Sequence, residues 1–153
     1  MKRDQARSLL EQALAELVSA RGHLDFSYRQ IEGLPGSLAG ATEKQLESVE
    51  AFTGRFARSV DLLVNKVLRS LDRMELYPEG TLLDSIHRAE KRGLVGGADE
   101  LREMKDVRNM IAHDYAGAKA AEIFVWCREQ KPVFDAICER AVAHAEQILS
   151  ASS

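Results

Sequence analysis

The stretch with the clearest chemical potential spans residues 108–115 and reads RNMIAHDY. Arg108 is permanently charged, and its planar fork of donors matches an anion such as a phosphate group. His113 is of the residue type whose ordinary pKa lies nearest neutral pH, so it suits the transfer of a proton. Asn109 lies one helical turn before His113 and is placed to orient the imidazole or a bound substrate. These three side chains are the candidate catalytic residues.

The helical wheel separates these side chains onto two faces. Arg108 falls on an apolar seam, whereas Asn109 and His113 fall on a polar face. An arginine in such a seam either pairs with a carboxylate at the edge of the core or presents its guanidinium to an anion. On a straight helix Arg108 and His113 are about 140° apart. They converge if the helix ends or bends near His113, or if two copies of this helix meet across a dimer axis. The seam comprises Leu101, Met104, Arg108, Ile111 and Tyr115.

The rest of the chain reads as helices that would position this stretch. Apolar residues recur at helical spacing, no period-2 segment appears, and Gly and Pro clusters separate the segments. Thr42 with Gln45 fits a capping box at the start of the second helix. Pro132 lies inside the last helix, where we expect a kink or a break. The expected helices span about 4–31, 43–75, 82–92, 99–115 and 120–149.

Composition agrees with a single all-α domain over residues 1–153, built as an up-and-down bundle of about five helices. Ala and Leu outnumber Val, Ile and Thr by about two to one. The net charge of −3 excludes a strongly basic coat protein for nucleic acids. No apolar run is long enough for a membrane span and no signal peptide is evident, so we expect a cytoplasmic protein. Cys127 and Cys138 are expected to be packed, reduced thiols, and the four scattered histidines form no metal site.

A second candidate feature is a run of basic residues on one side of the 43–75 helix. Its spacing would let it follow a phosphate backbone, so it is a candidate RNA-binding surface. Alternatively it is a solvated face, or a surface offered to an acidic partner. Asp61 and Asp72 lie off this run and are placed to pair with neighbouring basic residues. The run comprises Arg55, Arg58, Lys66, Arg69 and Arg73.

The segment RNMIAHDY resembles the R-x4-H-x-Y signature of the HEPN superfamily, specifically its HepT-like toxins. The stretch GTLLDSIHRAEKRGL, with the glycine loop that follows it, is similar as well. The resemblance implies a HEPN-like bundle that forms a homodimer, with the two motifs facing each other across the interface. It also implies a metal-independent endoribonuclease without a cofactor, whose products carry a 2′,3′-cyclic phosphate.

The resemblance gives Tyr115 a role of its own. HepT-like toxins are encoded beside a minimal nucleotidyltransferase (MNT-type) antitoxin, which transfers AMP from ATP to the motif tyrosine. An adenylate at Tyr115 would add negative charge and bulk where the RNA phosphate must bind, and would inactivate the nuclease. The implied partners are therefore the antitoxin, RNA and a second copy of the chain, with a larger even-numbered assembly when the antitoxin is bound.

Two other functions fit the same residues. Related helical bundles serve as non-catalytic, substrate-binding adaptors of a minimal nucleotidyltransferase. Alternatively the chain is a plain helical oligomer in which Arg108 and His113 are structural. The intact R-x4-H-x-Y motif favours the nuclease over the adaptor.

Overall fold

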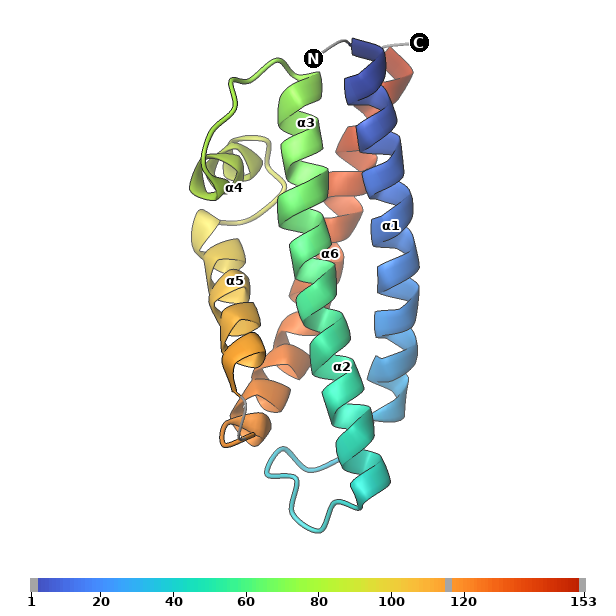
Figure 1. Cartoon of the computed structure of the whole chain (residues 1–153), viewed down its shortest axis with the longest axis vertical. Helices are drawn as coiled ribbons and strands as arrows, with labels where there is room; N and C mark the ends of the chain where they lie inside the picture. Colours follow the sequence, from blue (N-terminus) through green and yellow to red (C-terminus); the bar gives the residue numbers. More distant parts are fainter. Residues whose placement is uncertain (1–2, 115–116, 152–153) are drawn as a thin grey trace.

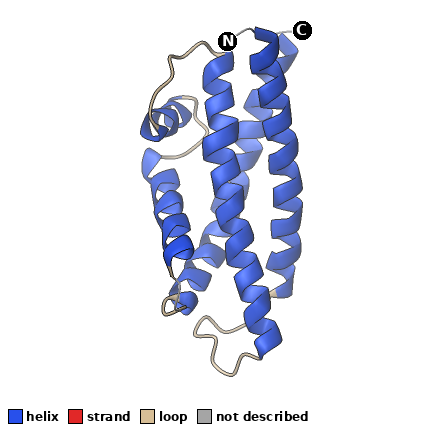
Figure 2. Cartoon of the chain, viewed as in Figure 1, coloured by secondary structure: helices blue, strands red, loops and turns tan. Residues whose placement is uncertain are grey.

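The computed structural model describes residues 3–114 and 117–151, and within these ranges every regular element is a helix (Figure 2). The expected all-α fold is therefore confirmed, and each predicted helix is present within a few residues of its expected bounds. The elements in chain order are α1 (Arg3–Gln30), α2 (Glu43–Asp61), the π-helical segment η1 (Leu62–Leu68), α3 (Arg69–Met74), α4 (Leu82–Lys91), α5 (Ala98–His113) and α6 (Ala120–Ala151).

Three long rods form the centre of the bundle (Figure 1). α2, η1 and α3 follow one another without a break and lie between α1 and the flank formed by α4 and α5. α6 runs behind them (Figure 1). The predicted helix over 43–75 is thus one rod, but seven of its residues are π-helical. A π turn inserts one extra residue, so the faces on either side of η1 are rotated relative to a uniform α-helix.

The helix starts that the sequence signals predict are formed by local hydrogen bonds. Thr42 Oγ1 accepts from the Gln45 amide at 3.1 Å, and Gln45 Oε1 accepts from the Thr42 amide at 2.9 Å. Thr81 and Asp84 form a second capping box at α4. Hydrogen bonds from Thr81 lower the pKa of Asp84 below its usual value. These boxes satisfy amide donors that the first helical turn leaves unpaired.

The core is built on aromatic side chains from α2 and α6. Phe52 packs edge-on against Phe124 with ring centroids 6.3 Å apart, and Phe56 packs against Phe134 at 5.4 Å. All four rings are fully buried. Trp126 is half-buried and packs edge-on against Phe56 at 6.0 Å.

Pro132 does not break α6, which is helical from Ala120 to Ala151. Proline removes one backbone donor from a helix, so a break there was one expected outcome. Continuity is favoured because the residues around it are anchored to the bundle. Lys131 and Phe134 are both buried, and Lys131 Nζ is within 2.6 Å of Asp25 on α1.

The buried Lys131 ammonium joins α1 to α6. Besides Asp25 it binds Asp135 Oδ2 at 2.6 Å, and its nitrogen lies 4.8 Å from the centre of the Tyr28 ring. Burial alone would lower the pKa of Lys131, but the hydrogen bonds to Asp135 and Asp25 outweigh it and raise the pKa. The side chain therefore stays charged, and it acts as a fixed cross-link between the two helices.

A second buried ion cluster, centred on Asp72, joins α3 to α4. The Asp72 side chain is 7 % exposed, and its carboxylate accepts from Arg92 at 2.8 Å, from Arg88 at 3.1 Å and from the Ser85 hydroxyl at 2.7 Å. The predicted pairing of Asp72 with neighbouring basic residues is confirmed. His144 of α6 is half-buried. Its Nε2 lies 3.1 Å from Glu75 Oε1, and Glu75 also binds Arg92, which extends the cluster to α6.

Both cysteines are free and buried, as expected, and burial raises the pKa of each thiol to about 12. Because the thiolate is the reactive form, the native protein is expected to react with a thiol reagent about a thousandfold more slowly than the unfolded chain. Titration with Ellman's reagent in buffer and in 6 M guanidinium, roughly a full unfolding dose, measures this. Rapid modification of Cys127 or Cys138 in buffer would contradict their burial.

Candidate active site

Helix α5 carries the candidate residues and packs on α2 and α4. Leu101 and Met104 are fully buried and Ile111 is half-buried, so the predicted apolar seam is the face that α5 turns to the bundle. Asp99 and Glu100 lie in the first turn, where carboxylates stabilise the positive end of the helix dipole. α5 therefore holds Arg108 at its contact with α2.

Arg108 pairs with Asp61 on α2. Its Nε donates to Asp61 Oδ2 at 2.7 Å, and Lys105 Nζ, one turn earlier, binds Asp61 Oδ1 at 2.9 Å. The first of the two alternatives for an arginine in the seam, a carboxylate partner at the edge of the core, is therefore present. The pairing uses Nε, and the Arg108 side chain remains 34 % exposed. Asp61 thus anchors the guanidinium while the outer nitrogens stay accessible to a ligand.

A groove of about 290 Å³ opens beside this ion pair, between α2 and α5. Its walls are small residues that leave room next to the charges, and Arg58 of α2 adds a further cation. Lys105 and Arg108 bind the Asp61 carboxylate and Arg58 lines the same groove, so the local charge is positive although the chain is acidic overall. The lining comprises Gly54, Ala57, Arg58, Asp61, Arg108, Ile111 and Ala112.

Asn109 and His113 lie on the exposed side of the same helix. Asn109 Oδ1 accepts from Arg108 Nη1 at 3.4 Å, so the amide contacts the guanidinium. His113 is the last residue of α5. One of the two conditions for convergence, a helix that ends near His113, is therefore met. The role of Asn109 toward the imidazole or a substrate stays a prediction.

Asp114, to which the sequence analysis gave no role, organises the turn after α5. Its carboxylate accepts from the Ala118 and Lys119 amides at 3.1 Å each, and its carbonyl accepts from the Gly117 amide at 3.1 Å. Gly117 has φ +67°, a conformation that glycine adopts without strain. An Asp followed by Gly three residues later is a turn signal that was available in the sequence. Tyr115, the predicted modification site, lies outside the described residues.

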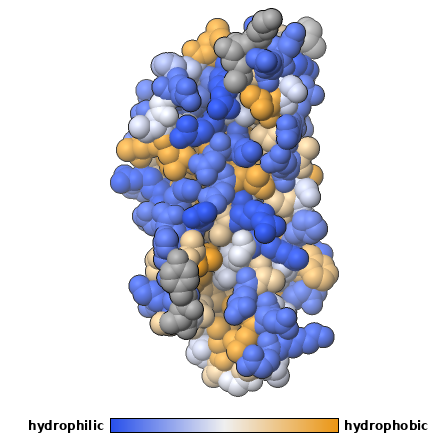
Figure 3. Space-filling view, in the orientation of Figure 1, coloured by the Kyte–Doolittle hydropathy of each residue, from blue (hydrophilic) through white to orange (hydrophobic). Residues whose placement is uncertain are grey.

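Four residues of the predicted basic run share the exposed edge of the α2–η1–α3 rod. Figure 3 shows hydrophilic side chains over the middle of this face. Arg55 differs, because its Nη1 donates to Ser27 Oγ at 2.7 Å and to the His23 carbonyl at 3.2 Å, both on α1. The Arg55 side chain therefore links α2 to α1 and is not part of the exposed basic edge. The four that remain on the edge are Arg58, Lys66, Arg69 and Arg73.

Comparison with known protein families identifies the family of this chain. The model of the family described as "Ribonuclease HepT-like" matches residues 64–141, about half of the chain. The chain belongs to the HepT-like ribonuclease family. The matched region includes all of α4 and α5, and with them Arg108, Asn109 and His113. The predicted resemblance of the chain to the HepT-like family is thereby confirmed, whereas the catalytic roles within RNMIAHDY stay predictions. No curated protein and no solved structure gives a significant match.

Two further properties concern membranes and metals. Over residues 3–114 and 117–151 of this HepT-like chain, no helix combines the length and apolarity that a membrane span requires. The same residues contain no group of three or more His, Cys, Asp or Glu side chains arranged to hold a metal ion. Metal independence itself stays a prediction.

Proposed function

We propose that this HepT-like protein is an endoribonuclease toxin that cleaves RNA without a metal ion, in the cytoplasm, using Arg108 and His113. The observation that carries the proposal is the family match across α5, combined with an Arg108 guanidinium that is anchored at Nε and exposed at its outer nitrogens. A guanidinium group that is held in one orientation is suited to binding a phosphate group.

The chemistry follows from the residue types. His113 takes the proton of a ribose 2′-hydroxyl, and the 2′-oxygen attacks the adjacent phosphorus. Arg108 stabilises the negative charge that develops on the non-bridging phosphate oxygens. The bond from phosphorus to the 5′-oxygen breaks, solvent supplies the proton to that oxygen, and the other product ends in a 2′,3′-cyclic phosphate. Asn109, in contact with Arg108, helps to hold the guanidinium or the substrate.

The proposal includes a homodimer with the two α5 helices at its axis. α5 exposes Met110, which is 36 % exposed, between the polar Asn109 and the terminal His113. A second copy seated there would cover this apolar side chain and bring two Arg108–His113 pairs into one cleft. Sedimentation analysis tests this: a monomer at the concentration used for cleavage assays would contradict the shared cleft.

Regulation is proposed to act on Tyr115 through a minimal nucleotidyltransferase antitoxin. The tyrosine oxygen attacks the α-phosphorus of ATP, pyrophosphate leaves, and AMP remains on the phenolic oxygen. Tyr115 follows His113 by two residues in the sequence. An added phosphodiester there would compete with RNA for Arg108. Intact-mass analysis after incubation with antitoxin and ATP, with Tyr115→Phe as the control, tests the modification.

The deciding experiment compares wild type with Arg108→Ala and His113→Ala for growth arrest, and then for RNA cleavage by the purified proteins in EDTA. Arrest and EDTA-resistant cleavage by wild type alone support the nuclease. Cleavage that EDTA abolishes would contradict metal independence. Identical behaviour of all three proteins without cleavage would overturn the proposal in favour of the adaptor function.

Asp61 is a positioning residue, because it holds Arg108 at Nε and takes no part in the proposed bond-making and bond-breaking steps. We expect Asp61→Ala to lower kcat by about 10- to 100-fold with little change in KM, and Asp61→Glu to recover part of the loss. Steady-state cleavage of a short oligonucleotide measures both constants. Asp99→Ala is the matched control, since it removes an exposed ion pair from α5, the helix that carries Arg108. A rise in KM with unchanged kcat would contradict the positioning role.

A further inference from the structure

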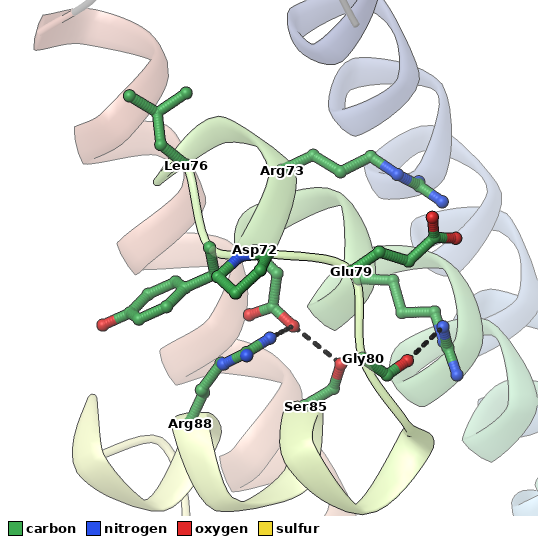
Figure 4. A pocket seen from close by; sticks show the side chains of 10 residues that line it. Asp72, Arg73, Leu76, Glu79, Gly80, Ser85 and Arg88 are labelled. Atoms are coloured by element: carbon green, nitrogen blue, oxygen red, sulfur yellow. Dashed lines mark hydrogen bonds and ion pairs between the residues drawn. The ribbon is translucent and has the colours of Figure 1, made fainter.

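A pocket of about 340 Å³ lies where α3, the following loop and α4 meet (Figure 4). Three arginines from two helices line it: Arg69 and Arg73 from α3, and Arg88 from α4. In Figure 1 this junction lies near the end of the rod opposite the start of α2, whereas the Arg108 groove lies between α2 and the last turns of α5. The pocket is therefore separate from the candidate active site.

Two of the three guanidinium groups are held in place and keep donors to spare. Arg88 Nη1 binds Asp72 Oδ2 at 3.1 Å, and its guanidinium carbon stacks 4.7 Å from the centre of the Tyr77 ring. Arg69 Nη1 donates to the Gly80 carbonyl at 3.4 Å. Each guanidinium carries five N–H donors, so most remain available. Preorganised arginines lose less conformational entropy when they bind a ligand.

Arg73 is the most available of the three. It is exposed, and its side chain forms no hydrogen bond or ion pair with another described residue. Figure 4 shows its side chain extending along the same side of the loop as Glu79. Glu79 forms no ion pair with any of the three arginines, and Asp72 is already bound to Arg92 as well as to Arg88. The unmatched charge of the pocket is positive, which suits an anionic ligand.

A series of basic residues along one edge of the α2–η1–α3 rod links the pocket to the candidate active site. Arg58 lines the groove beside Arg108, Lys66 follows on the exposed side of η1, and Arg69 and Arg73 reach the pocket. Arg58 and Arg73 are fifteen positions apart on this rod, and at about 1.5 Å per residue the separation is about 22 Å. A ligand with regularly spaced negative charges fits this arrangement better than a single small anion does.

We propose that this pocket is a second RNA subsite, which binds a backbone phosphate of the substrate at a distance from the cleaved bond. At about 3.4 Å per stacked nucleotide, the separation corresponds to about six nucleotides. Arg73 supplies an exposed contact, and Arg69 and Arg88 supply contacts that are already held in place. The subsite rests on the proposed ribonuclease function, and it adds a preference for single strands long enough to span both sites.

The test measures binding and cleavage of single-stranded RNAs of about 4 and about 16 nucleotides, shorter and longer than the span. We expect Arg69→Ala/Arg73→Ala to weaken binding of the longer RNA about tenfold or more. Its salt-dependence slope should fall by about 1.4, for two lost contacts to a single strand. Binding and cleavage of the shorter RNA should stay as in wild type. Glu79→Gln should tighten binding of the longer RNA, because it removes the opposing charge.

Arg29→Ala/Arg102→Ala is the matched control, since it removes two exposed arginines outside the pocket, on α1 and α5. Equal weakening of both RNA lengths by Arg69→Ala/Arg73→Ala, or an effect no larger than the control's, would overturn the subsite. An unchanged RNA affinity would favour an acidic protein surface as the ligand. Absence of cleavage by wild type would contradict the proposed function instead, and the binding measurements distinguish the two failures.

Discussion

His113→Ala is expected to lower kcat for RNA cleavage by about 10²- to 10⁴-fold, the range that a positioned general base contributes. The fold should be unaffected, because His113 is exposed at the last position of α5. Single-turnover cleavage of a short oligonucleotide measures the chemical step without product release. Added imidazole should restore part of the rate in this variant, because it replaces the missing base.

The matched control is His87→Ala, which removes an exposed histidine of α4 outside the groove. Its kcat should equal that of wild type within a factor of about two. A similar loss in both variants would indicate a structural effect on the bundle. Full activity of His113→Ala would exclude His113 from proton transfer, and with it the proposed mechanism.

Asp72→Ala is expected to lower the free energy of unfolding by about 3–5 kcal/mol. The Arg92 side chain is only 6 % exposed, and Arg92 Nη1 already lacks a hydrogen-bond partner among the described residues. Removal of Asp72 would leave Arg92 with Glu75 alone and would unpair Arg88. Because single domains of this size are stable by about 5–15 kcal/mol, the loss should be evident in urea unfolding followed by circular dichroism.

Two comparisons separate this effect from a general loss of charge. Asp99→Ala removes an exposed pair with Arg102 and should cost less than about 1 kcal/mol. Asp72→Leu combined with Arg92→Met replaces buried charges by apolar groups, and it should recover part of the stability that Asp72→Ala loses. A cost below about 1 kcal/mol for Asp72→Ala would contradict the central role of this carboxylate.

Much of the fold could be predicted because its signals are local. The capping boxes at Thr42 and Thr81 form between residues three positions apart, so both partners can be identified from a short stretch of sequence. The apolar seam of Leu101 and Met104 follows from the helical period alone. The candidate residues of α5 were identified in the same way, since RNMIAHDY is a contiguous motif.

The sequence by itself therefore determined the all-α class, the helix bounds to within a few residues, the family and the candidate catalytic side chains. Only the tertiary structure decided that Asp61 anchors Arg108, 47 positions away along the chain. It also decided that Arg55 is hydrogen-bonded to α1, and that Arg88 lines one pocket together with Arg69 and Arg73. Helix caps and periodicity depend on neighbours within a turn or two. Ion pairs between helices depend on which faces meet, and that is fixed only when the whole bundle packs.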